Sequence, residues 1–232
     1  MTPIVLVHGG GGDSRCWELV VDRLPGPVLA VDLPGRGAHP MPLRAVTLAA
    51  CAASVRDDVD RAGFDEIVLA GHSLAGCVMP GVVGLLGTRV RHAVFVAATV
   101  PDDGKSAYEM LDPAIQELIR AAGDAEPQPM SAAIAKMVLG DDLTPEQFDW
   151  CVERLVAEAP RLTTEPVDLS PLRSTMPRTW VRTLHDLIVP PARQMHYVEN
   201  VGDCAVVDVD AGHMCMVSRP DELAGILQEI AA

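Results

Sequence analysis

A serine between small residues interrupts an apolar stretch of the sequence. Residues 67–80 read IVLAGHSLAGCVMP, in which Ser73 follows a predicted strand and precedes a predicted helix. The G-x-S-x-G pattern needs small residues two positions either side of the serine, because the turn that holds it is tight. Gly71 meets this need, and Ala75 departs from it by one methyl group. The pattern indicates a hydroxyl exposed for nucleophilic attack, although a serine that only caps a helix is the competing interpretation.

Two stretches of backbone could stabilise negative charge beside Ser73. The N–H of Leu74 would lie at the start of the following helix, where backbone donors are free and the dipole favours an anion. Residues 8–17, HGGGGDSRCW, contain a run of glycines that lets the backbone approach a substrate closely. Phosphate binding there is disfavoured, since neither GxGxxG nor GxxxxGK[ST] occurs. His8, just before the glycines, suits a structural hydrogen bond better than catalysis.

A serine hydroxyl is a weak nucleophile and needs a base, which in turn needs an orienting carboxylate. His213 and Asp186 each follow a predicted strand, at the edge of an open α/β sheet where ligands bind. The chain order serine, aspartate, histidine is that of the α/β-hydrolases. Asp102 and Asp103, after another strand, are the alternative acids.

The elements that would position these residues alternate along the chain. Short β-branched runs are typical of buried parallel strands and occur at residues 3–8, 26–33, 65–72, 91–98, 178–183 and 204–211. Helical segments are predicted near residues 14–24, 43–62, 74–87, 191–200 and 220–231. This alternation predicts an α/β fold with a doubly wound, mostly parallel six-stranded sheet.

One interval departs from that alternation. Residues from about 101 to 176 are rich in Pro, Asp and Met, with helical pieces at 106–123 and 145–159. We expect a small helical cap inserted at about 101–176 within a single domain that spans residues 1–232. Apolar residues of this cap, with the loop glycines and a methionine beside the histidine, would contact substrate: Gly9, Gly11, Met110, Met137, Trp150 and Met214.

Composition narrows the possible partners. The 232 residues are 49% apolar and carry a net charge of −14, with no basic cluster, which disfavours nucleic acid and anionic membrane surfaces. Strongly anionic substrates are disfavoured too, unless a local arginine such as Arg15 or Arg36 reverses the charge near the site. The six cysteines show no CxxC or zinc-like spacing and are expected to be reduced, buried thiols. We expect a cytoplasmic protein without metal or cofactor, whose oligomeric state the sequence leaves open.

The chain resembles the α/β-hydrolase superfamily through VLVHGGGG, AVDLPGRG, GHSLAG, HDLIVP and AGHMCMVSRPDEL. It is most similar to the small-capped branch of plant-type hydroxynitrile lyases and methyl esterases, through TVPDDG, HDLIVPPARQMHYVENV and the histidine loop. The resemblance implies an α/β-hydrolase fold that lacks the two leading strands.

The resemblance also implies roles for individual residues. Ser73 would be the nucleophile, His213 the general base and then acid, and Asp186 its orienting carboxylate. The N–H groups of Gly10 and Leu74 would form the oxyanion hole. The related lyases carry a lysine after the catalytic histidine and a threonine after the first loop histidine. Met214 and Gly9 stand at those positions here, so the resemblance favours an esterase over a lyase.

We therefore predict a serine hydrolase that cleaves a carboxylic ester, or a thioester, of a small to medium apolar acid through an acyl-enzyme. The alternative hypotheses are a non-hydrolytic biosynthetic enzyme and a ligand-binding protein on the same fold. A perhydrolase side activity also stays open, since cofactor-free haloperoxidases share the triad.

Overall fold

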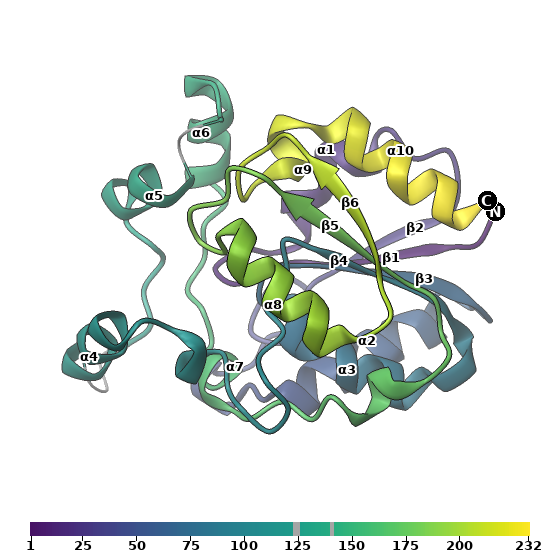
Figure 1. Ribbon diagram of the computed structural model, residues 1–232, viewed down its shortest axis with the longest axis horizontal. Coiled ribbons are helices and arrows are strands. Elements are labelled where there is room, and N and C mark those ends of the chain that lie inside the picture. The colour runs from purple at the N-terminus through teal and green to yellow at the C-terminus, as the bar shows by residue number, and fades with distance from the viewer. Residues whose placement is uncertain (123–125, 140–141) are drawn as a thin grey trace.

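A parallel sheet forms the centre of the computed structural model, which describes residues 1–122, 126–139 and 142–232. Within these residues six strands pair in the order β2-β1-β3-β4-β5-β6, and every pair is parallel (Figure 1). The strands are β1 (Ile4–Val7), β2 (Val28–Val31), β3 (Ile67–His72), β4 (Val90–Val96), β5 (Arg178–Thr183) and β6 (Ala205–Val209). The predicted doubly wound α/β fold is confirmed.

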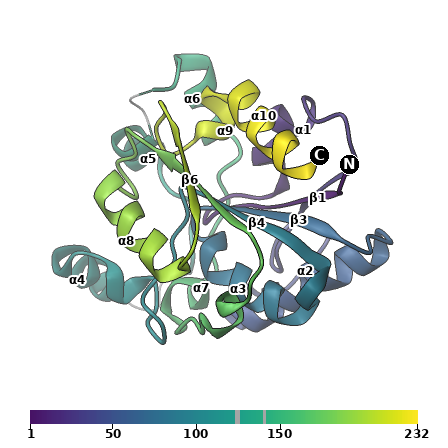
Figure 2. The ribbon, with the colours of Figure 1, turned by 45° about the vertical axis from the view of Figure 1, so that its right-hand side comes forward.

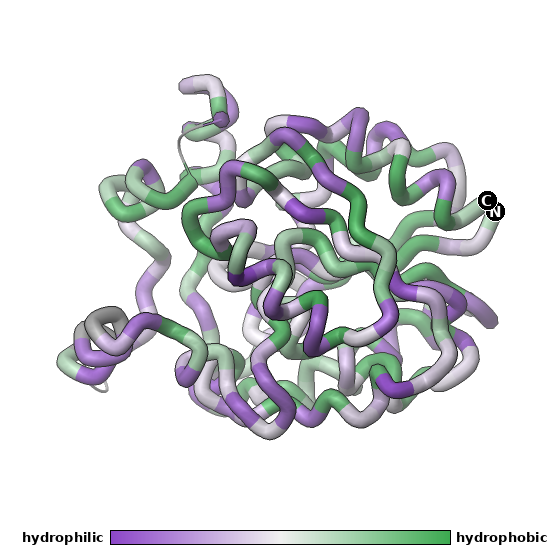
Figure 3. The backbone as a smooth tube through the Cα atoms, in the orientation of Figure 1, coloured by the Kyte–Doolittle hydropathy of each residue, from purple (hydrophilic) through white to green (hydrophobic). Residues whose placement is uncertain are grey.

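Helices cover both faces of the sheet because its strands are apolar on both sides. In β1, Val5 and Val7 face one core cluster, and Ile4 and Leu6 face the other, as strand periodicity requires. The first face is covered by α2 (Leu48–Arg61), α3 (Ala75–Leu86) and α8 (Pro191–Val201), and the second by α1 (Glu18–Val21), α9 (Cys215–Ser218) and α10 (Pro220–Ala231). Figures 1 and 2 show these two layers, and Figure 3 shows apolar strands between them.

The predicted helices near 14–24 and 43–62 each begin with a 3₁₀ turn. These turns are η1 (Ser14–Trp17), which leads into α1, and η2 (Leu43–Ala45), which is separated from α2 by two extended residues, Val46 and Thr47. Thr47 caps α2, since its hydroxyl accepts a hydrogen bond from the Ala50 N–H at 2.9 Å. The termini lie together (Figures 1 and 2), where the Thr2 N–H donates to the Ala231 carbonyl at 2.8 Å.

The chain between β4 and β5 carries several short helices that extend beyond the strand ends (Figure 1). They are η4 (Tyr108–Met110), α4 (Pro113–Ala122), α5 (Ala132–Leu139), α6 (Pro145–Val152), α7 (Arg161–Thr164) and η5 (Ser170–Arg173). The helix predicted over 106–123 is therefore interrupted, and α4 begins only at its proline. The predicted cap at 101–176 includes residues 123–125 and 140–141, which lie outside the described residues, and its place as an insertion within a single domain of residues 1–232 stays a prediction. Among the described helices, none has the length and apolar character needed to cross a membrane.

Candidate active site

Ser73 lies in a strained turn between β3 and α3. Its φ angle is +51°, in a region that costs a non-glycine residue about 1–3 kcal/mol. Two backbone hydrogen bonds to the end of β4 hold the turn: the Ser73 N–H donates to Val96 O at 3.0 Å, and the Thr99 N–H donates to Ser73 O at 2.8 Å. A Cβ on Gly71 would lie 2.5 Å from the Met79 sulfur, which explains the glycine two positions before the serine.

A continuous hydrogen-bonded chain links Ser73, His213 and Asp186. The Ser73 hydroxyl lies 2.9 Å from His213 Nε2, and His213 Nδ1 lies 2.7 Å from Asp186 Oδ2. An ionised carboxylate can only accept, so Nδ1–H donates to Asp186 and Nε2 is left to accept the serine proton. His213 and Asp186 are 4% and 2% exposed, which keeps this chain out of bulk water.

The carboxylate of Asp186 is held by the loop that carries it. Its Oδ1 accepts the backbone N–H groups of Ile188 and Val189, both at 2.8 Å, and its Oδ2 also accepts the Thr183 hydroxyl at 3.0 Å. Burial alone would raise the pKa of Asp186, but His213 and these donors hold it below its usual range. Asp186 therefore stays ionised and keeps the His213 ring in one orientation.

The other buried histidines of this region are structural. His72 Nε2 donates to the carbonyl of His213 at 2.9 Å, and burial, with His213 nearby, lowers the pKa of His72 to about 3. His8 Nδ1 donates to Gly9 O, while its Nε2 accepts the Leu33 N–H. Burial lowers the pKa of His8 to about 4, and the positive charge of Arg36 is the second cause. Both rings are uncharged at physiological pH and support the surrounding backbone through these hydrogen bonds.

The alternative acids have partners elsewhere. Asp102 accepts from His196 at 2.7 Å and from Asn200 at 3.1 Å, on α8. Asp103 accepts the Leu169 N–H and pairs with Arg173. Of the three candidate carboxylates, the structure brings only Asp186 to His213.

The glycine run and the start of α3 present two backbone donors beside Ser73. In the described part of the chain, the N–H groups of Gly10 and Leu74 have no hydrogen-bond acceptor. A Cβ on Gly9 would lie 2.8 Å from the Ser73 Cβ, so the loop backbone runs directly against the serine. This is the arrangement that binds an oxyanion.

Glu158 lies in the insertion, the segment at about 101–176 between β4 and β5, and holds the glycine loop. Its Oε2 accepts the Gly11 N–H at 2.8 Å, and its Oε1 accepts from Arg36 at 2.5 Å. The Arg36 side chain is 2% exposed and that of Glu158 22%. Sequence reasoning missed this pair as a site feature, because residues 122 positions apart leave no local pattern.

A cavity of about 430 Å³ opens onto Ser73 and His213. Gly9, Gly10, Gly11, Leu74, Trp150 and Met214 line it, as predicted for substrate-contacting or oxyanion-binding residues. Met110 and Met137 do not. Met110 instead packs against the core, and Met137 is 75% exposed on α5, because the insertion turns that face of the helix to solvent. Sequence reasoning also missed Arg193, a lining residue on α8.

Two of the six cysteines, Cys16 and Cys151, line the cavity as thiols. All six cysteines are free, and burial raises the pKa of the Cys51 and Cys77 thiols to about 12. Among the residues that the structure describes, no group of three or more His, Cys, Asp or Glu side chains could hold a metal ion.

Comparison with known proteins adds a family match. A model described as the alpha/beta hydrolase family matches residues 4–226. The chain is 26% identical to norfluorocurarine synthase 2 of a Strychnos species, with 97% of this chain and 94% of that protein covered. It is also 26% identical to methylesterase 3 of Arabidopsis thaliana, with 98% and 95% covered. An extracellular alpha/beta-hydrolase from a Paenibacillus species, 20% identical, has a TM-score of 0.86 over 100% of this chain and 99% of its own, a likeness of fold.

Proposed function

The chain belongs to the alpha/beta hydrolase family, as an enzyme of the carboxylesterase type, and we propose that it cleaves a carboxylic ester or thioester through Ser73. The resemblance expected from the sequence is confirmed, including its methyl esterase branch. The observation that carries the proposal is the chain of hydrogen bonds at 2.9 and 2.7 Å from Ser73 through His213 to Asp186.

Acylation begins when the Ser73 oxygen attacks the substrate carbonyl carbon and its proton moves to His213 Nε2. The carbonyl oxygen becomes an oxyanion, which accepts hydrogen bonds from the N–H groups of Gly10 and Leu74. His213 then gives its proton to the departing alcohol or thiol, the bond to the leaving group breaks, and Ser73 carries the acyl group.

Deacylation repeats these steps with water. His213 takes a proton from the water molecule that attacks the acyl-enzyme, and returns it to Ser73 as the free acid leaves. Asp186 stays ionised throughout, because the donors that hold its pKa down persist in both halves of the reaction.

The substrate is a small molecule with an apolar part of small to medium size. Leu111, Leu139, Leu155, Ile188 and Val189 line the cavity beside Trp150, and its volume of about 430 Å³ suits one such molecule. The name of methylesterase 3 supports an ester with a small alcohol group.

The test is hydrolysis of p-nitrophenyl esters of graded acyl length. Wild type should show a chain-length optimum, and Ser73→Ala should lose about 10⁴-fold or more in kcat, since triad members act as a unit. Ser174→Ala is the matched control, because Ser174 is exposed on the surface and should leave the rate unchanged. Equal rates for wild type and a folded Ser73→Ala protein would refute the proposal.

A second candidate is a non-hydrolytic reaction at the same serine. The similarity to a protein named norfluorocurarine synthase 2 favours it. Stable modification of Ser73 by a fluorophosphonate without turnover of any ester in the series would support this candidate over hydrolysis.

A further inference from the structure

An arginine without a counter-ion lines the same cavity. Arg193 lies in the first turn of α8 and is half-buried. In the described part of the chain its guanidinium has no hydrogen bond and no ion pair, although the chain carries a net charge of −14. A cation at this end of a helix is also disfavoured by the helix dipole. Neither local pairing nor helix stability accounts for its position.

The other arginines near the site are neutralised. Arg154 stacks on the Trp150 ring, 3.9 Å from its centroid, and pairs with Glu18 at 3.1 Å. Arg36 forms an ion pair with Glu158, and Arg15 forms one with Asp13. The two arginines that the sequence offered for a positive charge near the site are thus both paired, and Arg193 supplies that charge instead.

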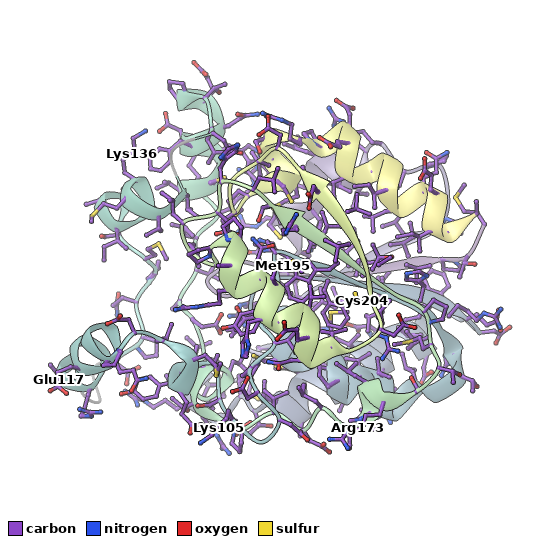
Figure 4. The ribbon with its side chains drawn as sticks, in the orientation of Figure 1. Lys105, Glu117, Lys136, Arg173, Met195 and Cys204 are labelled. Atoms are coloured by element: carbon purple, nitrogen blue, oxygen red, sulfur yellow. The ribbon has the colours of Figure 1, made fainter. Side chains whose placement is uncertain are left out.

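The backbone that carries Arg193 is held rigidly beside the catalytic acid. The neighbouring Gln194 is fully buried, and its amide donates to the Thr183 and Val189 carbonyls, both at 2.9 Å. The side-chain carbonyl oxygen of Gln194 accepts the Trp180 indole N–H at 3.2 Å. These bonds tie the start of α8 to the end of β5 and to the Asp186 loop, so Arg193 projects from a fixed support (Figure 4 labels Met195 on this helix).

A second polar group of α8 is also unpartnered at this wall. Tyr197, one turn after Arg193, is 2% exposed and lines the cavity, and its hydroxyl has no hydrogen bond to the described residues. Burial raises the pKa of the Tyr197 phenol to about 12, and the charge of Arg193 opposes part of that rise. The phenol is therefore a neutral donor within electrostatic reach of the guanidinium.

We propose that Arg193, with Tyr197 beside it, binds a carboxylate on the substrate, so that the enzyme acts on esters that carry a free acid group. This inference rests on the proposed ester chemistry at Ser73. An Arg and a Tyr hydroxyl together offer the planar fork and the extra donor that suit a carboxylate.

Apolar residues that line the cavity together with Ser73 and Arg193 define the remaining part of the substrate. Ile188 and Val189 follow Asp186 in the chain, precede Arg193 and line the cavity. A ligand that reaches both ends places its ester carbonyl at Ser73, an apolar spacer along this wall and its carboxylate at Arg193. A half-ester of an α,ω-dicarboxylic acid has this form.

The experiment compares monomethyl half-esters of dicarboxylic acids of graded length with the corresponding ω-amides, which have nearly the same shape and no charge. For wild type, kcat/KM should be higher for the acid than for the amide, with an optimum chain length. In Arg193→Met, the acid-to-amide ratio should fall about 10- to 100-fold, the effect of losing one charge-assisted pair. Arg193→Lys should keep part of the preference as a point charge.

The matched control is Arg173→Met. Arg173 is exposed, pairs with Asp103 and does not line the cavity (labelled in Figure 4), so the ratio should not change. Binding of the same esters to Ser73→Ala, by calorimetry, provides a readout that needs no turnover. There the acid should bind more tightly than the amide, and adding Arg193→Met should remove the difference.

The outcomes separate the two proposals. Hydrolysis of both esters with an equal ratio in wild type and Arg193→Met overturns the carboxylate site and leaves the esterase standing. Arg193-dependent binding without hydrolysis upholds the carboxylate site and overturns the esterase. If Ser73→Ala binds the acid no better than the amide, the carboxylate site is wrong.

Discussion

His213 and His72 lie with ring centroids only 4.6 Å apart, yet their surroundings give them different tasks. His213 lies between a hydroxyl and a carboxylate, so it can take up and release a proton. His72 donates to the backbone carbonyl of His213, and burial holds its pKa at about 3. One ring can carry the proton of the reaction while the other remains neutral and fixes its neighbour.

Replacing the acid tests the role of the His213 partner. Asp186→Asn should keep most of the cavity but lower kcat by about 10³- to 10⁴-fold, because the amide favours the wrong tautomer of the histidine. Steady-state ester hydrolysis, with circular dichroism to verify folding, measures this. Asp102→Asn is the control and should leave the rate near wild type, since Asp102 bonds to His196. A greater loss in Asp102→Asn would mean that the acid is wrongly assigned.

The buried histidines predict a loss of stability in acid. His8 and His72 have folded pKa values of about 4 and 3, lowered from 6.5, so below pH 6.5 the unfolded chain takes up protons that the folded chain excludes. Their stabilising effect is complete above pH 6.5 and decreases as pH falls, by up to about 1.4 kcal/mol per pH unit for each histidine. Urea unfolding between pH 7 and pH 5 measures this slope.

Variants separate this effect from other titrations. His72→Gln should reduce the slope by about one histidine's contribution, roughly 1.4 kcal/mol per pH unit. Ser174→Ala should not change it, because Ser174 is exposed and carries no titratable group. An unchanged slope in His72→Gln would contradict a neutral, buried His72.

At the scale of elements, residues of the insertion hold the glycine loop through hydrogen bonds at Gly11, and one of them, Glu158, also forms an ion pair with Arg36. Glu158→Ala removes the acceptor of the Gly11 N–H and leaves Arg36 buried without its partner. Unfolding free energy should fall by about 2–3 kcal/mol, less than for a fully buried pair because Glu158 is partly exposed. The kcat should also fall, since the neighbouring Gly10 N–H loses its support. Chemical denaturation and ester hydrolysis measure the two effects.

A double variant distinguishes the unpaired charge from lost packing. Glu158→Met with Arg36→Met should be more stable than Glu158→Met alone, because no buried charge remains. The exposed pair Glu117 and Arg120 on α4 is the control, and Glu117→Met should change stability by less than about 1 kcal/mol. If the double variant is the least stable, the unpaired charge of Arg36 is not the cause of the stability loss in Glu158→Met.

The strands and the helix that build the site could be predicted where a short stretch of sequence is enough to determine the secondary structure. The strand that ends at Thr183 and the helix at 191–201 were predicted within a residue, and the strand that ends at His72 was predicted two residues too long at its start, because β-branched runs and a proline start are local signals. Met110 and Met137 were predicted to contact substrate but do not line the cavity, since whether a methionine faces a cavity or solvent depends on how the insertion packs. Glu158 and Arg193 were missed, because their significance lies in partners, or their absence, across the fold.

At the scale of the whole molecule, separate segments of the chain meet at one edge of the sheet. The glycine run after β1, the turn after β3, the acid loop after β5 and the histidine loop after β6 all follow carboxyl ends of parallel strands. This convergence follows from topology, so the chain order predicted that Ser73, Asp186 and His213 would lie together although they are up to 140 residues apart. The cavity that these segments enclose also holds the positive charge of Arg193 in a strongly acidic protein.

Modification by a fluorophosphonate, followed by peptide mass mapping, tests directly whether Ser73 is an activated nucleophile. Only a serine activated by a base reacts readily with this reagent. We expect one adduct per chain, on the peptide that contains Ser73, formed far more slowly in Asp186→Asn and absent in Ser73→Ala. An enzyme that hydrolyses esters while its Ser73 stays unmodified, or one whose adduct lies on another residue, would contradict this expectation.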